Sequence, residues 1–345
     1  MVRIAVDAMG GDYAPREVVH GAVLAAREYG VTVQLVGLPD AINAELKRHV
    51  IDGLDIAIVP ASEVVGMDEN PPRAVAKKKD SSIVVATRQA AEGKADAVVT
   101  AGSTGAAVAA SRFYLGRLEG VERAPIAAMM PTVNGLQRPC VMMDAGAYHD
   151  AEAHHLQQFA IMGMILAESL FKISSPKVGI LNIGTEESKG TEMVRQAYKL
   201  LRNDKRLNFQ GFIEGRDFPM GKADVLVTDG FSGNVALKTA EGIAKMISVI
   251  LRQEIYSSMR TKVGGRLAQP AFDGLKRRTD YNEFGGALLI GLKAVFVKAH
   301  GGSKQTAIKN AIRSARDMVD ANVVKQIEWA LSSVNAGVSP PGAKK

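Results

Sequence analysis

The segment Arg3-Ile4-Ala5-Val6-Asp7-Ala8-Met9-Gly10-Gly11-Asp12 joins an apolar run to a glycine-rich loop. Its first part predicts an initial β-strand at residues 3–7 rather than a signal peptide. Four more glycine-containing loops follow apolar runs and precede expected helices. They cover residues 100–105, 182–187, 229–234 and 300–303.

Loops of this kind predict a binding site for an anion. In an open parallel sheet, the loops at the carboxyl ends of the strands line one crevice, where ligands bind. Glycine allows backbone N–H groups to approach a ligand closely, and the start of the following helix favours negative charge. Five such loops on one edge of a sheet therefore indicate a site for phosphate or a phosphorylated substrate.

The composition is that of an ordinary globular protein. The length of 345 residues is enough for one large α/β domain or two smaller ones. The content of 47% hydrophobic and 23% charged residues is ordinary for a globular protein. The single Cys140 excludes an internal disulfide and fits a reducing cytoplasm. No uncharged apolar run is long enough to span a bilayer.

The formal net charge of +7 favours acidic partners, which include phosphates, acidic proteins and anionic lipids. The basic residues are spread along the chain and are not interleaved with aromatic residues. We therefore do not expect nucleic acid as a partner.

Apolar runs alternate with helical patterns along the chain, which predicts a doubly wound α/β fold, an αβα sandwich. The expected strands are 3–7, 31–37, 56–60, 97–100, 126–130, 141–144, 178–183, 225–228 and 289–297. The expected helices are 16–29, 41–50, 83–92, 104–115, 152–171, 193–201, 234–259 and 306–331. We expect a single domain over residues 1–335 and a disordered tail at 336–345.

The segment 234–259 is unusually long for one helix, and its apolar residues recur at helical spacing. A basic, glycine-containing segment follows and extends the region to about residue 280. Two interpretations are open. The helix packs on the core or on a second subunit, or it forms a projecting amphipathic hairpin that touches a membrane surface.

Several other site types are disfavoured. No two glycines are two residues apart, so the dinucleotide fingerprint is missing. The spacing of His149, His154 and His155 suits a metal poorly. Cys140 precedes an apolar strand, as expected for a buried thiol. The aspartates that end expected strands, Asp7, Asp144 and Asp229, favour loop capping over a shared metal. We expect neither a metal nor a cofactor.

The loops taken together resemble those of the bacterial phosphate acyltransferases that use acyl-acyl-carrier-protein as donor. The matching segments include Phe212-Ile213-Glu214-Gly215-Arg216-Asp217 and Asp229-Gly230-Phe231-Ser232-Gly233-Asn234-Val235. Residues 4–12, 101–106 and 181–190 match as well, and the order and spacing fit to about residue 320. Two positions depart from the family pattern. Ser103 and Tyr148 each stand where the family usually has Asn, and the bulk of Tyr148 puts a ligand contact there in question.

The resemblance implies a fold like that of the isocitrate and isopropylmalate dehydrogenases, which phosphotransacetylases share. It also implies a homodimer with a site between two lobes. The protein would be cytoplasmic and peripherally associated with the inner face of the cell membrane, where it would pass acyl phosphate to the glycerol-3-phosphate acyltransferase. The acidic acyl carrier protein would suit the basic segment at residues 260–278.

Inorganic phosphate is already an anionic nucleophile near pH 7, so the expected reaction needs positioning and oxyanion stabilisation more than a strong base. We hypothesise that Lys189 supplies charge to the phosphate and that Asn234 donates to the phosphate or the oxyanion. The residues expected to bind substrate are Asp7, Gly10, Gly11, Gly102, Ser103, Thr104, Gly105, Gly184, Asp229, Gly233, His300 and Gly301.

Three alternatives remain. The first is a phosphotransacetylase that uses acyl-CoA, with the same fold and chemistry. The second is a dehydrogenase of the isocitrate type, which the missing nicotinamide motif disfavours. The third is a membrane-bound scaffold that binds acyl carrier protein without catalysis.

Overall fold

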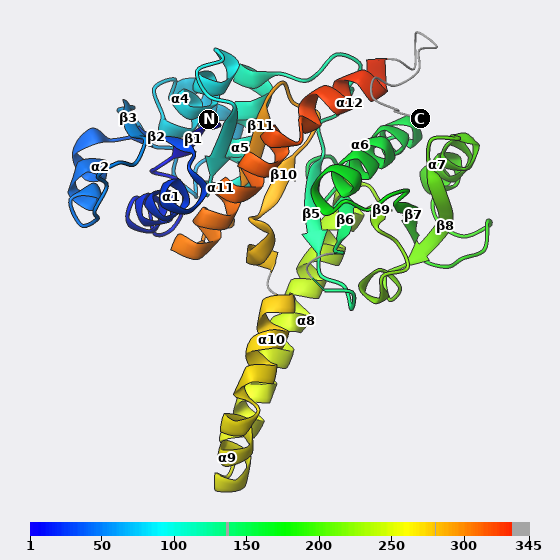
Figure 1. The fold of residues 1–345 in the computed structure, drawn as a ribbon. Coiled ribbons are helices and arrows are strands. Elements are labelled where there is room, and N and C mark those ends of the chain that lie inside the picture. The colour runs from blue at the N-terminus through cyan, green and yellow to red at the C-terminus, as the bar shows by residue number, and fades with distance from the viewer. Residues whose placement is uncertain (136–137, 280, 333–345) are drawn as a thin grey trace.

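The computed structural model describes residues 1–135, 138–279 and 281–332. A sheet between two layers of helices forms the body of the molecule, and a helical arm projects from it (Figure 1). The expected doubly wound α/β sandwich is confirmed. The tail expected at residues 336–345 lies outside the described residues.

The described strands form one sheet in the order β3-β2-β1-β4-β11-β10-β5-β6-β9-β7-β8. Their bounds are β1 Arg3–Asp7, β2 Thr32–Gly37, β3 Ile56–Pro60, β4 Ala97–Thr100, β5 Ile126–Met130, β6 Cys140–Met143, β7 Lys177–Asn182, β8 Asn208–Glu214, β9 Val225–Val227, β10 Ala287–Leu289 and β11 Val295–Lys298.

The two halves of this sheet run in opposite directions. The pairings from β3 to β11 are parallel, and so are those from β6 to β8. Between them, β11, β10, β5 and β6 pair antiparallel. Three successive antiparallel pairings reverse the strand direction once overall. The expectation that all five loops share one edge of a parallel sheet was therefore wrong.

Helices cover both faces of the sheet. Their bounds are α1 Arg16–Tyr29, α2 Pro39–Leu46, α3 Pro71–Lys77, α4 Ser82–Ala91, α5 Thr104–Ala110, α6 Ala153–Phe171, α7 Glu192–Asn203, α8 Gly230–Tyr256, α9 Met259–Leu267, α10 Gln269–Thr279, α11 Gln305–Asp320 and α12 Val323–Ser332, with short turns η1 Ser111–Leu115, η2 Phe218–Met220 and η3 Tyr281–Phe284. Buried residues of α1, α6, α7, α11 and α12 pack on one face, and those of α3, α4 and α5 pack on the other.

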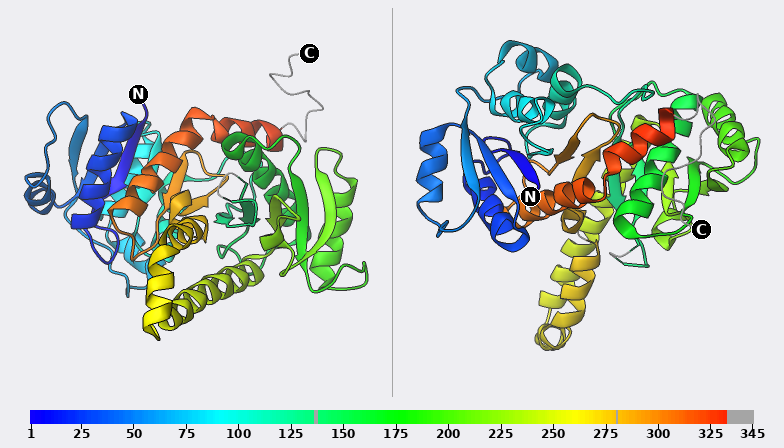
Figure 2. Two further views of the ribbon diagram at one scale, coloured as in Figure 1. Left: turned by 60° about the horizontal axis from the view of Figure 1, so that its bottom comes forward. Right: turned by 45° about the horizontal axis from the view of Figure 1, so that its top comes forward.

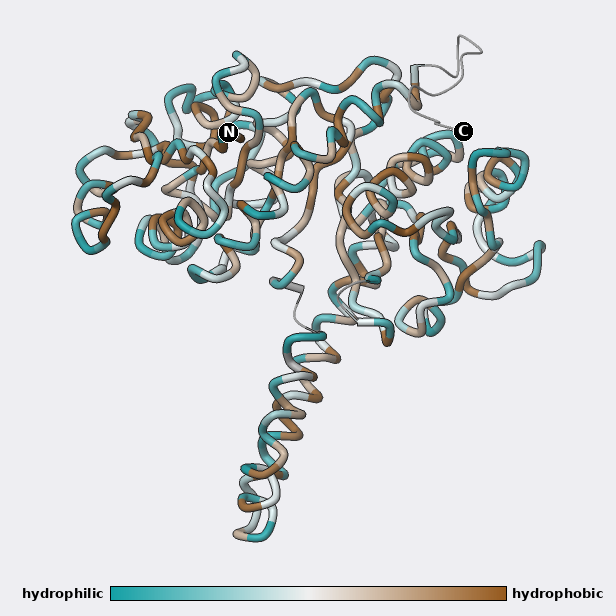
Figure 3. Tube along the Cα trace, viewed as in Figure 1, coloured by the Kyte–Doolittle hydropathy of each residue, from teal (hydrophilic) through white to brown (hydrophobic). Residues whose placement is uncertain are grey.

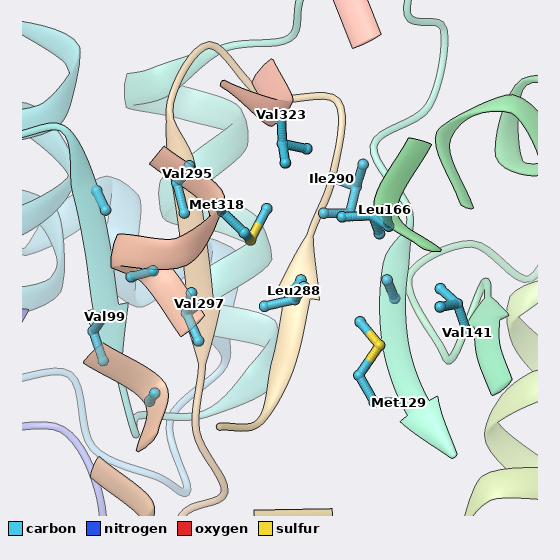
Figure 4. Close-up of a cluster of buried hydrophobic side chains, with 14 of the residues drawn as sticks. Val99, Met129, Val141, Leu166, Leu288, Ile290, Val295, Val297, Met318 and Val323 are labelled. Carbon is cyan, nitrogen blue, oxygen red and sulfur yellow. The ribbon is translucent and has the colours of Figure 1, made fainter. Parts of the chain in front are cut away.

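Strand residues divide between the two faces because successive side chains of a strand point in opposite directions. In β1, Ile4 and Val6 enter one apolar core and Ala5 enters the other. The first core continues across the antiparallel centre of the sheet, where Met129, Leu288 and Val297 lie together (Figure 4). The two halves of the body are thus joined by one packed interior.

Two of the expected elements are each divided in two by a turn. The expected strand at 289–297 is two strands, β10 and β11, because Gly291 turns the chain with a φ of +81°. The expected helix at 306–331 is divided into α11 and α12 at Asn322, whose φ is +53°. Strand β8 at the sheet edge was not expected.

The arm consists of most of α8 together with α9 and α10, with α9 at its tip (Figures 1 and 2). Apolar and polar residues alternate along it (Figure 3). Ten of its large apolar side chains are each at least 47% exposed: Ile243, Met246, Ile247, Val249, Ile250, Tyr256, Met259, Val263, Leu267 and Leu275. Among the described helices, none combines the length and the apolar character needed to cross a membrane.

Candidate active site

A cavity of about 590 Å³ lies on the face of the sheet that carries α3, α4 and α5, near the antiparallel strands β5 and β10. This volume is within the range of small-molecule sites. Most of its lining is apolar. The apolar side chains are Pro72, Val108, Ala109, Phe113, Ile126, Ala128, Met129, Ala145, Ala147, Leu237, Ala287 and Leu289, and the polar ones are Thr104, Arg112, Asn234, Lys238, Glu241, Lys298 and His300.

Both halves of the sheet contribute to this cavity. Thr104 and His300 follow β4 and β11 of one half, whereas Gly146 and Asn234 follow β6 and β9 of the other half. Neighbouring strands rotate by roughly 20–25°, so four pairings from β4 to β6 accumulate about 90° of twist. Such a twist rotates the two halves relative to each other, and residues that follow strands of opposite direction line the same cavity.

In the first half, three loops pack against one another, and two of them contribute Thr104 and His300 to the cavity lining. Asp7 is 2% exposed and accepts a hydrogen bond from the Thr100 hydroxyl at 2.7 Å. Gly10 must be glycine, because a Cβ there would lie 2.8 Å from the Gly102 nitrogen. The Asp12 N–H donates to the Gly301 carbonyl at 2.9 Å, so the loops after β1, β4 and β11 form one unit that includes Gly11.

Next to this unit, the 102–105 loop starts α5. The Ser103 hydroxyl accepts from the Ala106 N–H at 3.2 Å, so Ser103 caps the helix. Thr104 and Gly105 line the cavity and are exposed. Of this motif, Thr104 and Gly105 are thus the residues placed to meet a ligand.

In the second half, the aspartates organise the backbone as loop caps. Asp144 accepts from the N–H groups of Ile126 and Tyr148 at 2.9 and 2.8 Å. Asp229 caps α8 by accepting from the N–H groups of Phe231 and Ser232, each at 2.9 Å. The expected capping role of these aspartates is confirmed.

Gly233 and Asn234 lie in the first turn of α8. Gly233 packs on the Asp144 carbonyl, which leaves no room for a Cβ. This close approach brings Asn234 to the cavity, where its side chain lies beside Gly146.

Lys189 and Gly184 lie in the loop that follows β7, next to β9 in the sheet. Gly184 is buried, and its carbonyl accepts from the Asn182 amide at 3.1 Å. Lys189 is exposed and is not among the residues that line the cavity. The role hypothesised for Lys189 therefore stays a prediction.

Lys298 was missed at the sequence level. It is the last residue of β11 and points to the same side of the strand as Phe296, toward the cavity. Burial, followed by the nearby Lys238, lowers the pKa of Lys298 to about 8. Burial and the two lysines also lower the pKa of His300. The sequence signal that could have identified Lys298 is a lysine at the end of an apolar strand, two residues before His300.

Other residues singled out from the sequence lie elsewhere. The centre of the Tyr148 ring lies 4.9 Å from the Arg123 guanidinium, and Tyr148 is not among the residues that line the cavity. Cys140 is fully buried, which raises the pKa of its thiol. His154 and His155 meet Glu122, their potential ligand atoms within 4.8 Å of one another. His155 Nδ1 accepts from the Glu152 N–H at 2.9 Å, so this ring also caps α6.

The fold defines a structural class that includes a solved phosphotransacetylase. A solved phosphotransacetylase from Streptococcus pyogenes is similar to this chain, with a TM-score of 0.62 and 18% sequence identity over 94% of each chain. The fold that the resemblance implied is thereby confirmed.

Sequence comparison then gives the family. A family model described as "Fatty acid synthesis protein" matches residues 2–326. A relative from Pelotomaculum thermopropionicum is 47% identical over 333 residues, which are 96% of each chain. One from Heliobacterium modesticaldum is 48% identical over 328 residues, 95% of this chain and 97% of its own. Both relatives are named phosphate acyltransferase, and this chain belongs to their family.

Proposed function

We propose that this protein transfers a long-chain fatty acyl group from acyl carrier protein to inorganic phosphate, reversibly, and so forms acyl phosphate. Membership of the family makes the protein an acyltransferase that acts on phosphate. The observation that carries the finer proposal is the lining of the cavity, where a long apolar wall stands beside a few cationic and amide groups. An acyl chain suits the wall, and phosphate suits the polar groups.

The proposed step requires no covalent enzyme intermediate. A phosphate oxygen attacks the thioester carbonyl, the new carbon–oxygen bond forms and the carbon–sulfur bond breaks. The proton of hydrogen phosphate ends on the released thiol. Because the thiolate is a fair leaving group, the enzyme has mainly to position the reactants and stabilise the oxyanion.

Within the cavity, Asn234 is our candidate donor to the phosphate or the oxyanion, with Thr104 and Gly105 in support. Lys189 is proposed to add charge from the neighbouring loop. The packed glycines and aspartates around them hold the loops in place.

The arm supports the proposed partners. Its exposed apolar side chains would remain in water in an isolated protomer, so we propose that it contacts a second copy in a homodimer. At the tip, Met259 and Leu267 are 75% and 80% exposed beside Arg260 and Arg266. Apolar and basic residues together suit an anionic membrane surface or an acidic carrier protein. A peripheral position there would allow transfer of acyl phosphate to the membrane-bound glycerol-3-phosphate acyltransferase.

Product formation tests the proposal. Purified protein is incubated with inorganic phosphate and either palmitoyl-acyl carrier protein or palmitoyl-CoA, and acyl phosphate is trapped with hydroxylamine. We expect phosphate-dependent hydroxamate from the carrier-protein donor alone. Hydroxamate from CoA alone would make the protein a phosphotransacetylase. Without hydroxamate from either donor, catalysis of this kind is ruled out and the binding scaffold becomes the better hypothesis.

A further inference from the structure

Two basic side chains that line the cavity, Lys298 and the exposed Arg112, have no ion pair within the described part of the chain, and of the two only Lys298 is half-buried. Lys298 is half-buried and lines the cavity at the level of Thr100, its partner in β4. Across residues 1–135, 138–279 and 281–332, the Lys298 ammonium has neither a hydrogen bond nor an ion pair. The nearby Lys238, in contrast, pairs with Glu241 at 2.7 Å.

The charges around Lys298 do not compensate it. The groups that act on its ammonium are Lys238, which disfavours the charged form, and Asp12 and Glu241, which favour it. Glu241 is already engaged by Lys238, and burial is the largest single influence on the pKa of Lys298. A half-buried ammonium without a partner is costly, and an anion that enters the cavity would remove this cost.

We propose that Lys298 is a further phosphate-binding residue, whose ammonium pairs with the phosphate substrate between Lys238 and His300. This inference rests on the proposed function and deepens it. Lys298 remains an ammonium throughout and forms no bond to the substrate. Its contribution is to hold the nucleophile inside the cavity, where Asn234 lies as well, whereas Lys189 is exposed on a separate loop.

Variants at two lysines of the same hairpin test this assignment. Lys298→Gln removes the charge at nearly constant volume, and Lys293→Gln does the same at an exposed lysine between β10 and β11. Phosphate binding to the protein alone is measured by titration calorimetry, and the KM values for phosphate and acyl donor are measured with the hydroxamate assay.

We expect Lys298→Gln to weaken phosphate binding and to raise the KM for phosphate at least tenfold, as for other charge-assisted hydrogen bonds. The KM for the acyl donor should stay within about twofold, and Lys293→Gln should match the wild type. If folded Lys298→Gln binds phosphate like the wild type, the inference is wrong even where hydroxamate forms. If the wild type binds phosphate but makes no acyl phosphate, the proposed reaction fails separately.

The wild-type protein provides a second test that does not depend on the folding of Lys298→Gln. With a pKa of about 8 for Lys298 in the free protein, its binding-competent fraction falls about tenfold between pH 7 and pH 9. Lys298→Arg keeps its charge over this range. The phosphate KM of the wild type should therefore rise about tenfold relative to that of Lys298→Arg. The same pH dependence in both proteins would contradict the assignment. The comparison cancels the ionisation of phosphate itself.

Discussion

At the scale of single residues, two kinds of position can be distinguished in and around the cavity. Asn234, Thr104 and Lys298 present polar groups to the cavity, whereas Asp7 and Asp229 are occupied by the backbone and hydroxyl groups that they anchor. We propose that the first kind contacts a ligand, whereas the second kind holds the loops.

Alanine substitutions test whether Asn234 and Lys189, the two residues proposed to be catalytic, each contribute to turnover. Asn234→Ala should lower kcat by about 10²–10³, the usual effect of losing one oxyanion donor. Lys189→Ala should lower the turnover if its ammonium reaches the phosphate. Both are measured with the hydroxamate assay, with folding checked by circular dichroism. A folded Lys189→Ala that retains most of its turnover would eliminate Lys189 from the mechanism, and the same result for Asn234→Ala would eliminate Asn234.

Two glycines of α8 form a matched pair for a steric prediction. A Cβ at Gly233 would collide with the Asp144 carbonyl, whereas a Cβ at Gly242 meets nothing within 4 Å. Gly233→Ala should therefore destabilise the protein by roughly 1–3 kcal/mol. Gly242→Ala should be neutral or stabilise it by up to about 1 kcal/mol. Urea unfolding measures both, and equal stabilities for the two variants would show that α8 is not seated as described.

At the scale of elements, the sequence predicted best the strands that are continuous apolar runs. The bounds of β1, β3, β4 and β5 agree with the expected strands, because continuous apolar runs between turn residues identify such strands. The edge strand β8 was missed because polar residues and a glycine interrupt its apolar residues, in contrast to the apolar run of the edge strand β3. Lys298 was missed because it looks, in sequence, like the polar end of a strand.

The arm is the element that an isolated protomer leaves most exposed. Ile247 is 52% exposed on α8, and Ile247→Asp should weaken self-association if arms pair in a homodimer. Ser248→Asp, which places the same charge one residue away, is the control and should weaken self-association less. Sedimentation equilibrium should give twice the protomer mass for the wild type and a smaller average for Ile247→Asp. A monomeric wild type would remove the dimer from the proposal.

At the scale of the whole molecule, the sequence did not predict that the strand direction reverses between the two halves of the sheet. Local patterns predict strands, but pairing partners and directions depend on contacts between distant segments. The same limit applies to the cavity. The loops that contain Thr104, Asn234 and His300 were identified in the sequence. The sequence did not predict that these loops reach the cavity from two halves of the sheet with opposite strand directions.

Whether the body is one domain is a question of cooperativity. The core that contains Met129, Leu288 and Val297 continues across the centre of the sheet, so we expect both halves to unfold together. Fluorescence of Trp329, the single tryptophan, and far-UV circular dichroism should give coincident urea transitions. Separate midpoints for the two signals would divide the body into two domains and contradict the single domain expected for residues 1–335.

Helix α8 begins at the cavity and ends near the tip of the arm. At 1.5 Å per residue, its 27 residues span about 40 Å. In mechanical terms α8 is a lever, and its N-terminal part at the body includes the cavity residues Asn234, Leu237 and Glu241. A tilt of about 5° at the body displaces a tip about 40 Å away by about 3.5 Å. A contact at the tip that tilted α8 would therefore also change the width of the cavity, because Asn234, Leu237 and Glu241 line it.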